Sequence, residues 1–163
     1  MWFVIATALV AGLSVAAEQV AQEQYIRKYD AVVDATTELL TLHLADGRLS
    51  MRVSTVHDGR RRTAIPRRIE LLITGDGPLI NDARTIETSV VIRADARVFT
   101  RCTRNPRDMS TMNAVAVVCT FDNFKGLTDA QSIDGDAFGR SFVVAPGQLT
   151  ALRALADRWM VPE

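Results

Sequence analysis

The residues best able to do chemistry in this chain are two cysteines, two histidines and a dense group of arginines. Cys102 and Cys119 are too far apart for a redox C-x-x-C motif, and two cysteines alone cannot complete a structural zinc site. An even number of cysteines is typical of an exported chain, in which thiols pair as disulfides. If residues 97–103 and 115–121 form a hairpin, both thiols lie on one face. We therefore predict a structural Cys102–Cys119 disulfide.

Catalytic and metal-binding patterns are weak. Nucleophilic catalysis needs a nearby base, and His43 and His57 are the only histidines. The chain has no G-x-S-x-G motif, and His57 lies in an expected turn. Asp134-Gly135-Asp136 does not match an EF-hand loop, and Asp-Gly pairs are typical of turns. The sequence thus identifies no catalytic residue, no metal ligand and no cofactor.

Arginine is the strongest surface signal. Planar guanidinium groups can bind carboxylate or phosphate through paired hydrogen bonds. Eight arginines, five within nine residues and three along one expected strand face, form the candidate surface for an anionic partner: Arg60, Arg61, Arg62, Arg67, Arg68, Arg93, Arg97 and Arg101. The partner would be a protein or an anionic envelope component, such as an acidic glycan or lipid headgroups. The alternative is a solvated loop whose arginines pair with Asp58, Glu87 and Asp95.

The first five of these arginines are expected to be exposed, because each buried guanidinium would need its own acceptors. Exposed charges contribute little to folding stability. On this interpretation, replacement of Arg61 and Arg62 by glutamine leaves the melting temperature nearly unchanged.

The first seventeen residues predict export. Residues 2–17 carry no charge, end in the small residues Ser14–Ala17 and precede the polar pair Glu18-Gln19, as in a secretory signal peptide. A retained membrane anchor stays open, although the run is shorter than the roughly 20 apolar residues of a spanning helix. A buried core element is a third possibility. We expect a periplasmic or secreted protein, with membrane contact only if this segment is retained.

Composition bounds the remaining chain. Residues 18–163 have the length of one domain, and 48 % of the whole chain is hydrophobic, as in globular proteins. The net charge is zero and aromatic residues are few, so nucleic acid is not an expected partner.

The residue pattern predicts an α+β domain, a mainly antiparallel sheet packed with an N-terminal and a C-terminal helix. The clearest element is a hairpin around Asp46-Gly47, which pairs Leu44 with Leu49, Leu42 with Met51 and Leu40 with Val53. The other expected elements are a helix over 18–35, strands at 69–74 and 114–121, one long bent strand or two over 86–103, a polar loop over 122–139, a strand at 141–144 and a helix over 148–160.

These observations favour a non-enzymatic exported domain that acts through its surface as an accessory or binding module. Two alternatives stay open. One is a small periplasmic hydrolase whose acidic or histidine chemistry the spacing does not reveal. The other is an accessory subunit of a membrane complex held by an uncleaved N-terminal helix.

Overall fold

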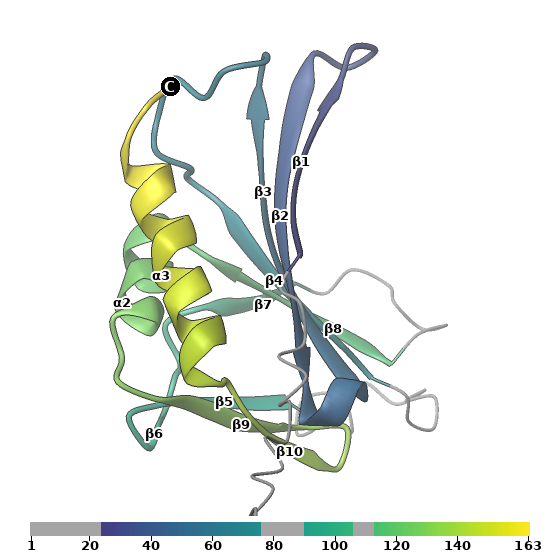
Figure 1. Ribbon diagram of the computed structural model, residues 1–163, viewed down its shortest axis with the longest axis vertical. Helices are drawn as coiled ribbons and strands as arrows, with labels where there is room; N and C mark the ends of the chain where they lie inside the picture. The colour runs from purple at the N-terminus through teal and green to yellow at the C-terminus, as the bar shows by residue number, and fades with distance from the viewer. Residues whose placement is uncertain (1–23, 76–89, 106–112) are drawn as a thin grey trace, which may run out of the picture.

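The computed structural model describes residues 24–75, 90–105 and 113–163 (Figure 1). The predicted signal segment, residues 1–17, lies outside them. The described part of the chain contains these elements in order: β1 (Gln24–Asp30), β2 (Ala35–Leu44), the short 3-10 turn η1 (Ala45–Gly47), β3 (Leu49–Asp58), β4 (Ile69–Gly75), β5 (Val90–Ala94), β6 (Arg97–Val98), β7 (Thr103–Asn105), β8 (Ala114–Cys119), α2 (Phe121–Thr128), β9 (Ile133–Ala137), β10 (Arg140–Val143) and α3 (Pro146–Met160).

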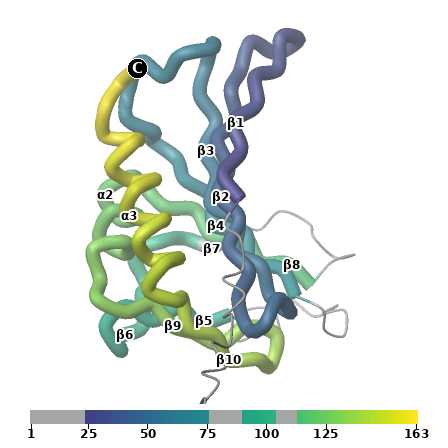
Figure 2. The backbone as a smooth tube through the Cα atoms, viewed as in Figure 1, coloured from purple at the N-terminus to yellow at the C-terminus, as the bar shows by residue number. Residues whose placement is uncertain are grey.

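The described strands form two antiparallel sheets, which confirms the α+β class and the antiparallel pairing. The larger sheet has the order β1-β2-β3-β4-β8-β7, and the smaller has the order β10-β9-β5-β6. The helices α2 and α3 lie along one face of the larger sheet, and the smaller sheet lies at one end of the molecule, near η1 (Figures 1 and 2). Core side chains fill the space between these layers.

The predicted hairpin is confirmed in position and register. Leu44 pairs with Leu49, Leu42 with Met51 and Leu40 with Val53, and all six side chains are buried on the core face. Residues 45–48 connect the paired Leu44 and Leu49, and Ala45, Asp46 and Gly47 all adopt positive φ angles. The exposed His43 points to the other face, as expected.

The helix predicted over 18–35 is wrong for the residues that the structure describes. Residues 24–30 form β1, which pairs with β2 from Gln24↔Thr41 to Asp30↔Ala35; residues 18–23 lie outside the description. β1 is an edge strand with mostly exposed side chains, so it lacks the clean alternation of a half-buried strand. Its tyrosines and the following β-branched residues favour extended structure.

The segment over 86–103 is also not one continuous strand in its described part. The chain reverses direction after β5, and β6 pairs antiparallel with β5 through Arg93↔Val98 and Ala94↔Arg97. Asp95 and Ala96 form the turn with positive φ angles of 50° and 62°, the conformation that a two-residue hairpin requires. The Asp95 carboxylate accepts hydrogen bonds from the backbone N–H groups of Gln131 and Ser132, which offsets the cost of this conformation.

The polar loop expected over 122–139 contains α2 and β9. Thr120 caps α2 by accepting a hydrogen bond from the Asn123 N–H at 3.3 Å. In β9, Gly135 lies where a Cβ atom would be 2.2 Å from the Val91 carbonyl oxygen. The Asp134-Gly135-Asp136 motif is therefore a strand that needs close backbone approach, not a turn.

The predicted C-terminal helix is confirmed and begins at Pro146, two residues earlier than expected. Its buried stripe consists of Leu149, Leu152, Leu155, Ala156 and Trp159. The Trp159 ring lies 5.6 Å from that of Phe124 on α2, which joins the two helices over the sheet. The C-terminal end of α3 thereby comes close to the ends of β2 and β3 (Figure 1).

Candidate functional site

The predicted arginine run occupies the connection between β3 and β4. Arg60, Arg61, Arg67 and Arg68 are exposed there, as expected, and we call these four residues the arginine surface. Arg62 is the exception, because its side chain is 0 % exposed. The expectation that all five arginines stand in solvent is therefore wrong for Arg62, which does not belong to the candidate surface.

Arg62 is buried because three acceptors surround its guanidinium group. Its Nη1 donates to the Trp159 carbonyl at 2.8 Å, and its Nη2 donates to the Arg158 carbonyl at 2.7 Å. Both carbonyls lie in the last turn of α3, where no further helical N–H is available to them. A cation at this helix end also complements the helix dipole. The third acceptor is the Glu38 carboxylate, 3.3 Å from Nε.

Glu38 is the acidic centre of this buried network. Its Oε2 accepts hydrogen bonds from Trp159 Nε1 at 2.7 Å and from the Tyr25 hydroxyl at 3.0 Å. His57 Nε2 lies 3.3 Å from its Oε1, without hydrogen-bond geometry. Burial, and to a lesser degree the neighbouring carboxylate, raises the pKa of Tyr25 although Arg158 opposes the shift. The network links β1, β2, β3 and α3.

The network also makes the Glu38 carboxylate inaccessible. Glu38 is 0 % exposed, and protein donors occupy both of its oxygens. A general base must reach the proton that it abstracts, and this carboxylate is directed at Tyr25, Arg62 and Trp159 instead. The arrangement stabilises an ion pair that the interior would otherwise penalise. Glu38 therefore joins β1, the β3–β4 connection and α3.

The backbone that carries the arginine surface is held at several points. The Gly59 carbonyl accepts from Thr36 Oγ1 at 2.6 Å, and the Arg68 carbonyl accepts from Thr55 Oγ1 at 3.0 Å. The Arg60 and Arg62 carbonyls accept from the Arg27 guanidinium at 2.6 Å and from the Glu163 N–H at 2.8 Å. The connection is thus pre-organised, which lowers the entropic cost of presenting its side chains to a partner.

The four exposed guanidinium groups have few protein partners among the described residues. Arg60 lies over the Tyr29 ring at 4.8 Å, and Arg68 lies 4.0 Å from Glu70, the limit of an ion pair. Arg61 and Arg67 form no ion pair with the described part of the chain. The alternative, in which acidic residues neutralise these arginines, is wrong for Asp95, whose carboxylate accepts from the backbone N–H groups of Gln131 and Ser132. Glu87 lies outside the described residues.

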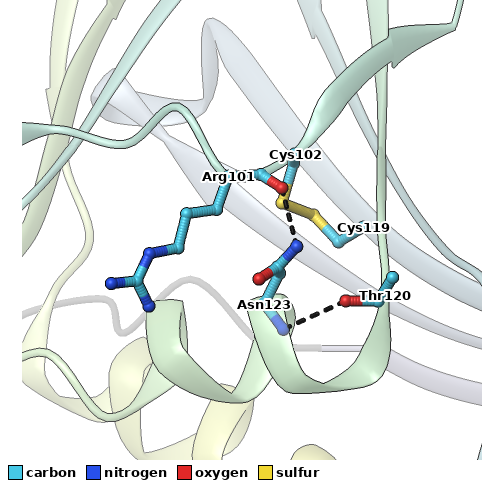
Figure 3. The surroundings of a disulfide bond; sticks show 5 residues. All are labelled: Arg101, Cys102, Cys119, Thr120 and Asn123. Atoms are coloured by element: carbon cyan, nitrogen blue, oxygen red, sulfur yellow. Dashed lines mark hydrogen bonds between the residues drawn. A yellow bond between two sulfur atoms is a disulfide. The ribbon is translucent and has the colours of Figure 1, made fainter.

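Arg93 and Arg97 do not extend this surface, and Arg101 lies beside α2 (Figure 3). Arg93 and Arg97 belong to β5 and β6, at the opposite end of the molecule from the β3–β4 connection (Figure 1). Arg93 bridges Asp134 at 2.6 Å and Asp136 at 2.8 Å. These hydrogen bonds raise the pKa of Arg93, and those from Ser141 and Arg93 lower the pKa of Asp136. The expected single patch of eight arginines is therefore wrong.

The predicted cysteine pair lies at disulfide distance. The two sulfur atoms are 2.00 Å apart and the Cα atoms 4.6 Å apart. Thr103 pairs with Val118, so continuation of this register places Cys102 opposite Cys119, as the strand phase predicts. Next to the bridge, the Arg101 carbonyl accepts from Asn123 Nδ2 at 2.7 Å, while the Asn123 N–H donates to Thr120 (Figure 3). The bridge thus joins β7, β8 and the start of α2.

Within the described residues, no group of three or more His, Cys, Asp or Glu side chains is arranged to hold a metal ion. In the same residues, no helix combines the length and the apolar character needed to cross a membrane.

Sequence reasoning missed Glu38, Tyr25 and Trp159 as a connected group. One signal was present, because Glu38 shares the alternating phase of Leu40 and Leu42 and so had to face the core.

Comparison of the chain with protein-family models, with curated proteins and with solved structures found no match.

Proposed function

We propose that the protein is a non-catalytic exported binding domain that uses the arginine surface to hold an anionic partner. Four exposed guanidinium groups on one held connection support this proposal most directly. Arg61 and Arg67 carry it furthest, because both are exposed and form no ion pair with the described residues. The predicted N-terminal signal and the disulfide pair are compatible with work outside the cytoplasm.

The recognition chemistry follows from the guanidinium group. Each exposed arginine can give two parallel hydrogen bonds to one carboxylate, phosphate or sulfate. The chain as a whole has zero net charge, so attraction must come from this local excess and not from a global field. Binding should therefore weaken as salt screens the exposed charges.

The test measures binding of a heparin oligosaccharide, a soluble polyanion, by calorimetry at low and at physiological salt. The variant Arg61→Gln/Arg67→Gln removes two charges from the arginine surface. The matched control Arg48→Gln/Arg97→Gln removes two exposed charges, one from the residue after η1 and one from β6, at the other end of the molecule. We expect the first variant to lose about tenfold in affinity at low salt and the control less than about twofold.

Equal losses in the two variants would show that only overall charge matters and would reject the arginine surface. Undetectable heparin binding by the unmodified chain at low salt would reject the proposed function. The melting temperatures of both variants should stay close to that of the parent chain, which separates lost binding from lost folding.

A further inference from the structure

Exposed apolar side chains gather beside the arginine surface. Nine large apolar residues are exposed in the described part of the chain, and seven of them lie in the segments at this end: Ile26, Val32, Val33, Val56, Ile65, Met160 and Val161. Val32 and Val33 stand out, with 93 % and 67 % of their surface exposed. They form the turn between β1 and β2, where Gly, Asn, Asp and Ser are the usual residues.

Hydrogen bonds join the segments that carry these residues. The Gly59 N–H donates to the Asp34 carbonyl at 2.7 Å, which ties the β1–β2 turn to the end of β3. The Glu163 N–H donates to the Arg62 carbonyl, which ties the residues after α3 to the β3–β4 connection. Figures 1 and 2 show all three segments at the same end of the molecule. We call residues 26–34, 56–68 and 158–163 the tip surface.

The tip surface also carries more basic than acidic side chains. It contains seven exposed Lys and Arg residues but only four Asp and Glu residues. An eighth basic residue, Arg62, is buried against Glu38 and adds no charge to the surface. Three of the four acids have partners within it: Asp30 accepts from the Val32 N–H, Asp34 accepts from the Tyr29 hydroxyl and Glu163 binds Arg27. Asp58 is the fourth and is exposed. A local positive excess therefore surrounds the two protruding valines.

We propose that the tip surface docks on an anionic lipid bilayer, with Val32 and Val33 inserted between headgroups and the arginines bound to lipid phosphates. This inference rests on the proposed function and names the source of the anion. Reversible membrane binding combines buried apolar area with attraction of basic residues to anionic lipid, and the tip surface offers both. The core of a protein interface is instead rich in aromatic residues and poor in charge.

The experiment measures sedimentation of the chain with vesicles of phosphatidylcholine, with or without phosphatidylglycerol. The test variant is Val32→Ser/Val33→Ser. Its matched control is Val98→Ser/Val143→Ser, which removes two valines of similar exposure, 61 % and 68 %, from the smaller sheet. All variants have the same length, so residues 1–17 contribute equally. We expect the test variant to lose about tenfold in partitioning to the anionic vesicles, and the control to match the parent.

A local reporter follows the tip itself. Val33→Trp places an indole at the turn, and quenching by lipids brominated on their acyl chains requires this indole to enter the bilayer. The parent chain gives the baseline from Trp2 and Trp159. We expect additional quenching in the variant with anionic vesicles and not with pure phosphatidylcholine.

The outcomes separate the two proposals. Heparin binding without binding to anionic vesicles would overturn the lipid inference and leave the proposed function intact. Equal vesicle binding by Val32→Ser/Val33→Ser and its parent, or absence of additional quenching, would also overturn the inference. Failure to bind both heparin and vesicles would reject both proposals.

Discussion

Arg62 and Glu38 meet inside the protein, with Arg62 Nε 3.3 Å from Glu38 Oε1 and neither side chain exposed. The two residues are 24 positions apart in the sequence. Arg62 also donates to the carbonyl of Trp159, which lies 97 positions after it. One arginine thus fastens the β3–β4 connection to β2 and to the end of α3. Its four exposed neighbours are carried by the backbone that this contact holds in place.

Replacement of Arg62 should therefore have an effect that replacement of Arg61 does not. Arg62→Gln leaves the buried Glu38 without its cation and the α3 carbonyls without their donor, a loss that typically costs about 3–5 kcal/mol. Arg61→Gln changes only an exposed charge and should leave the melting temperature nearly unchanged. Urea denaturation of both single variants measures the difference.

The double variant Glu38→Gln/Arg62→Gln provides the control. Because the two residues act as a pair, its loss should be smaller than the sum of the two single losses. A near-neutral Arg62→Gln would contradict the buried network.

Glu163 predicts a pH dependence at the same end of the molecule. The hydrogen bond from Arg27, at 2.8 Å, lowers the pKa of Glu163 from its ordinary value of 4.5. A carboxyl group with a lower pKa in the folded state adds stability that is fully present above pH 4.5 and is lost as the pH falls through the lowered pKa. We therefore expect Glu163 to stay ionised to a lower pH than an ordinary glutamate. A carboxyl carbon NMR titration measures its pKa directly.

Arg27→Gln is the matched variant for this titration. It should move the pKa of Glu163 back towards 4.5, because Arg27 supplies the largest contribution to the shift. The same pKa in both chains would show that the Arg27–Glu163 contact does not persist in solution.

Local patterns were sufficient where strand phase decided the structure. Alternation of Leu40 and Leu42 with polar residues placed the β2–β3 hairpin, and the phase of Cys102 against Cys119 predicted their proximity. Local patterns failed at the edge strand β1, where exposure on both sides removes the alternation that identifies a strand. They also failed at Asp95-Ala96, because a tight turn there reverses the chain without interrupting the phase of the sequence.

The candidate surface was predictable only in part for a related reason. Nothing local distinguishes Arg62 from Arg61, since the acceptors that bury Arg62 come from β2 and α3. The expected alignment of Arg93 and Arg97 with Arg60–Arg68 required knowledge of how the two sheets are placed. Only the tertiary structure places Arg93 and Arg97 at the opposite end of the molecule from the β3–β4 connection.

The Cys102–Cys119 bridge allows a last prediction, which concerns stability. It closes a span of 17 residues between the start of β7 and the end of β8. In the chain-entropy account, closure of a loop of this length stabilises the fold by about 3 kcal/mol, mainly by restricting the unfolded chain. Next to the bridge, Asn123 on α2 hydrogen-bonds the Arg101 carbonyl, so release of Cys102 should also loosen the start of this helix (Figure 3).

We therefore expect Cys102→Ala/Cys119→Ala to lower the free energy of unfolding by about 3 kcal/mol. Denaturant titrations should compare this variant with the oxidised and the reduced parent chain. The reduced parent should unfold near the variant, and the oxidised parent at clearly higher denaturant. Non-reducing peptide mapping of the exported protein gives the covalent state directly and should show residues 102 and 119 linked. Two free thiols in folded, exported protein, or an unfolding midpoint that does not respond to reductant, would mean that β7 and β8 are held by strand pairing and packing alone.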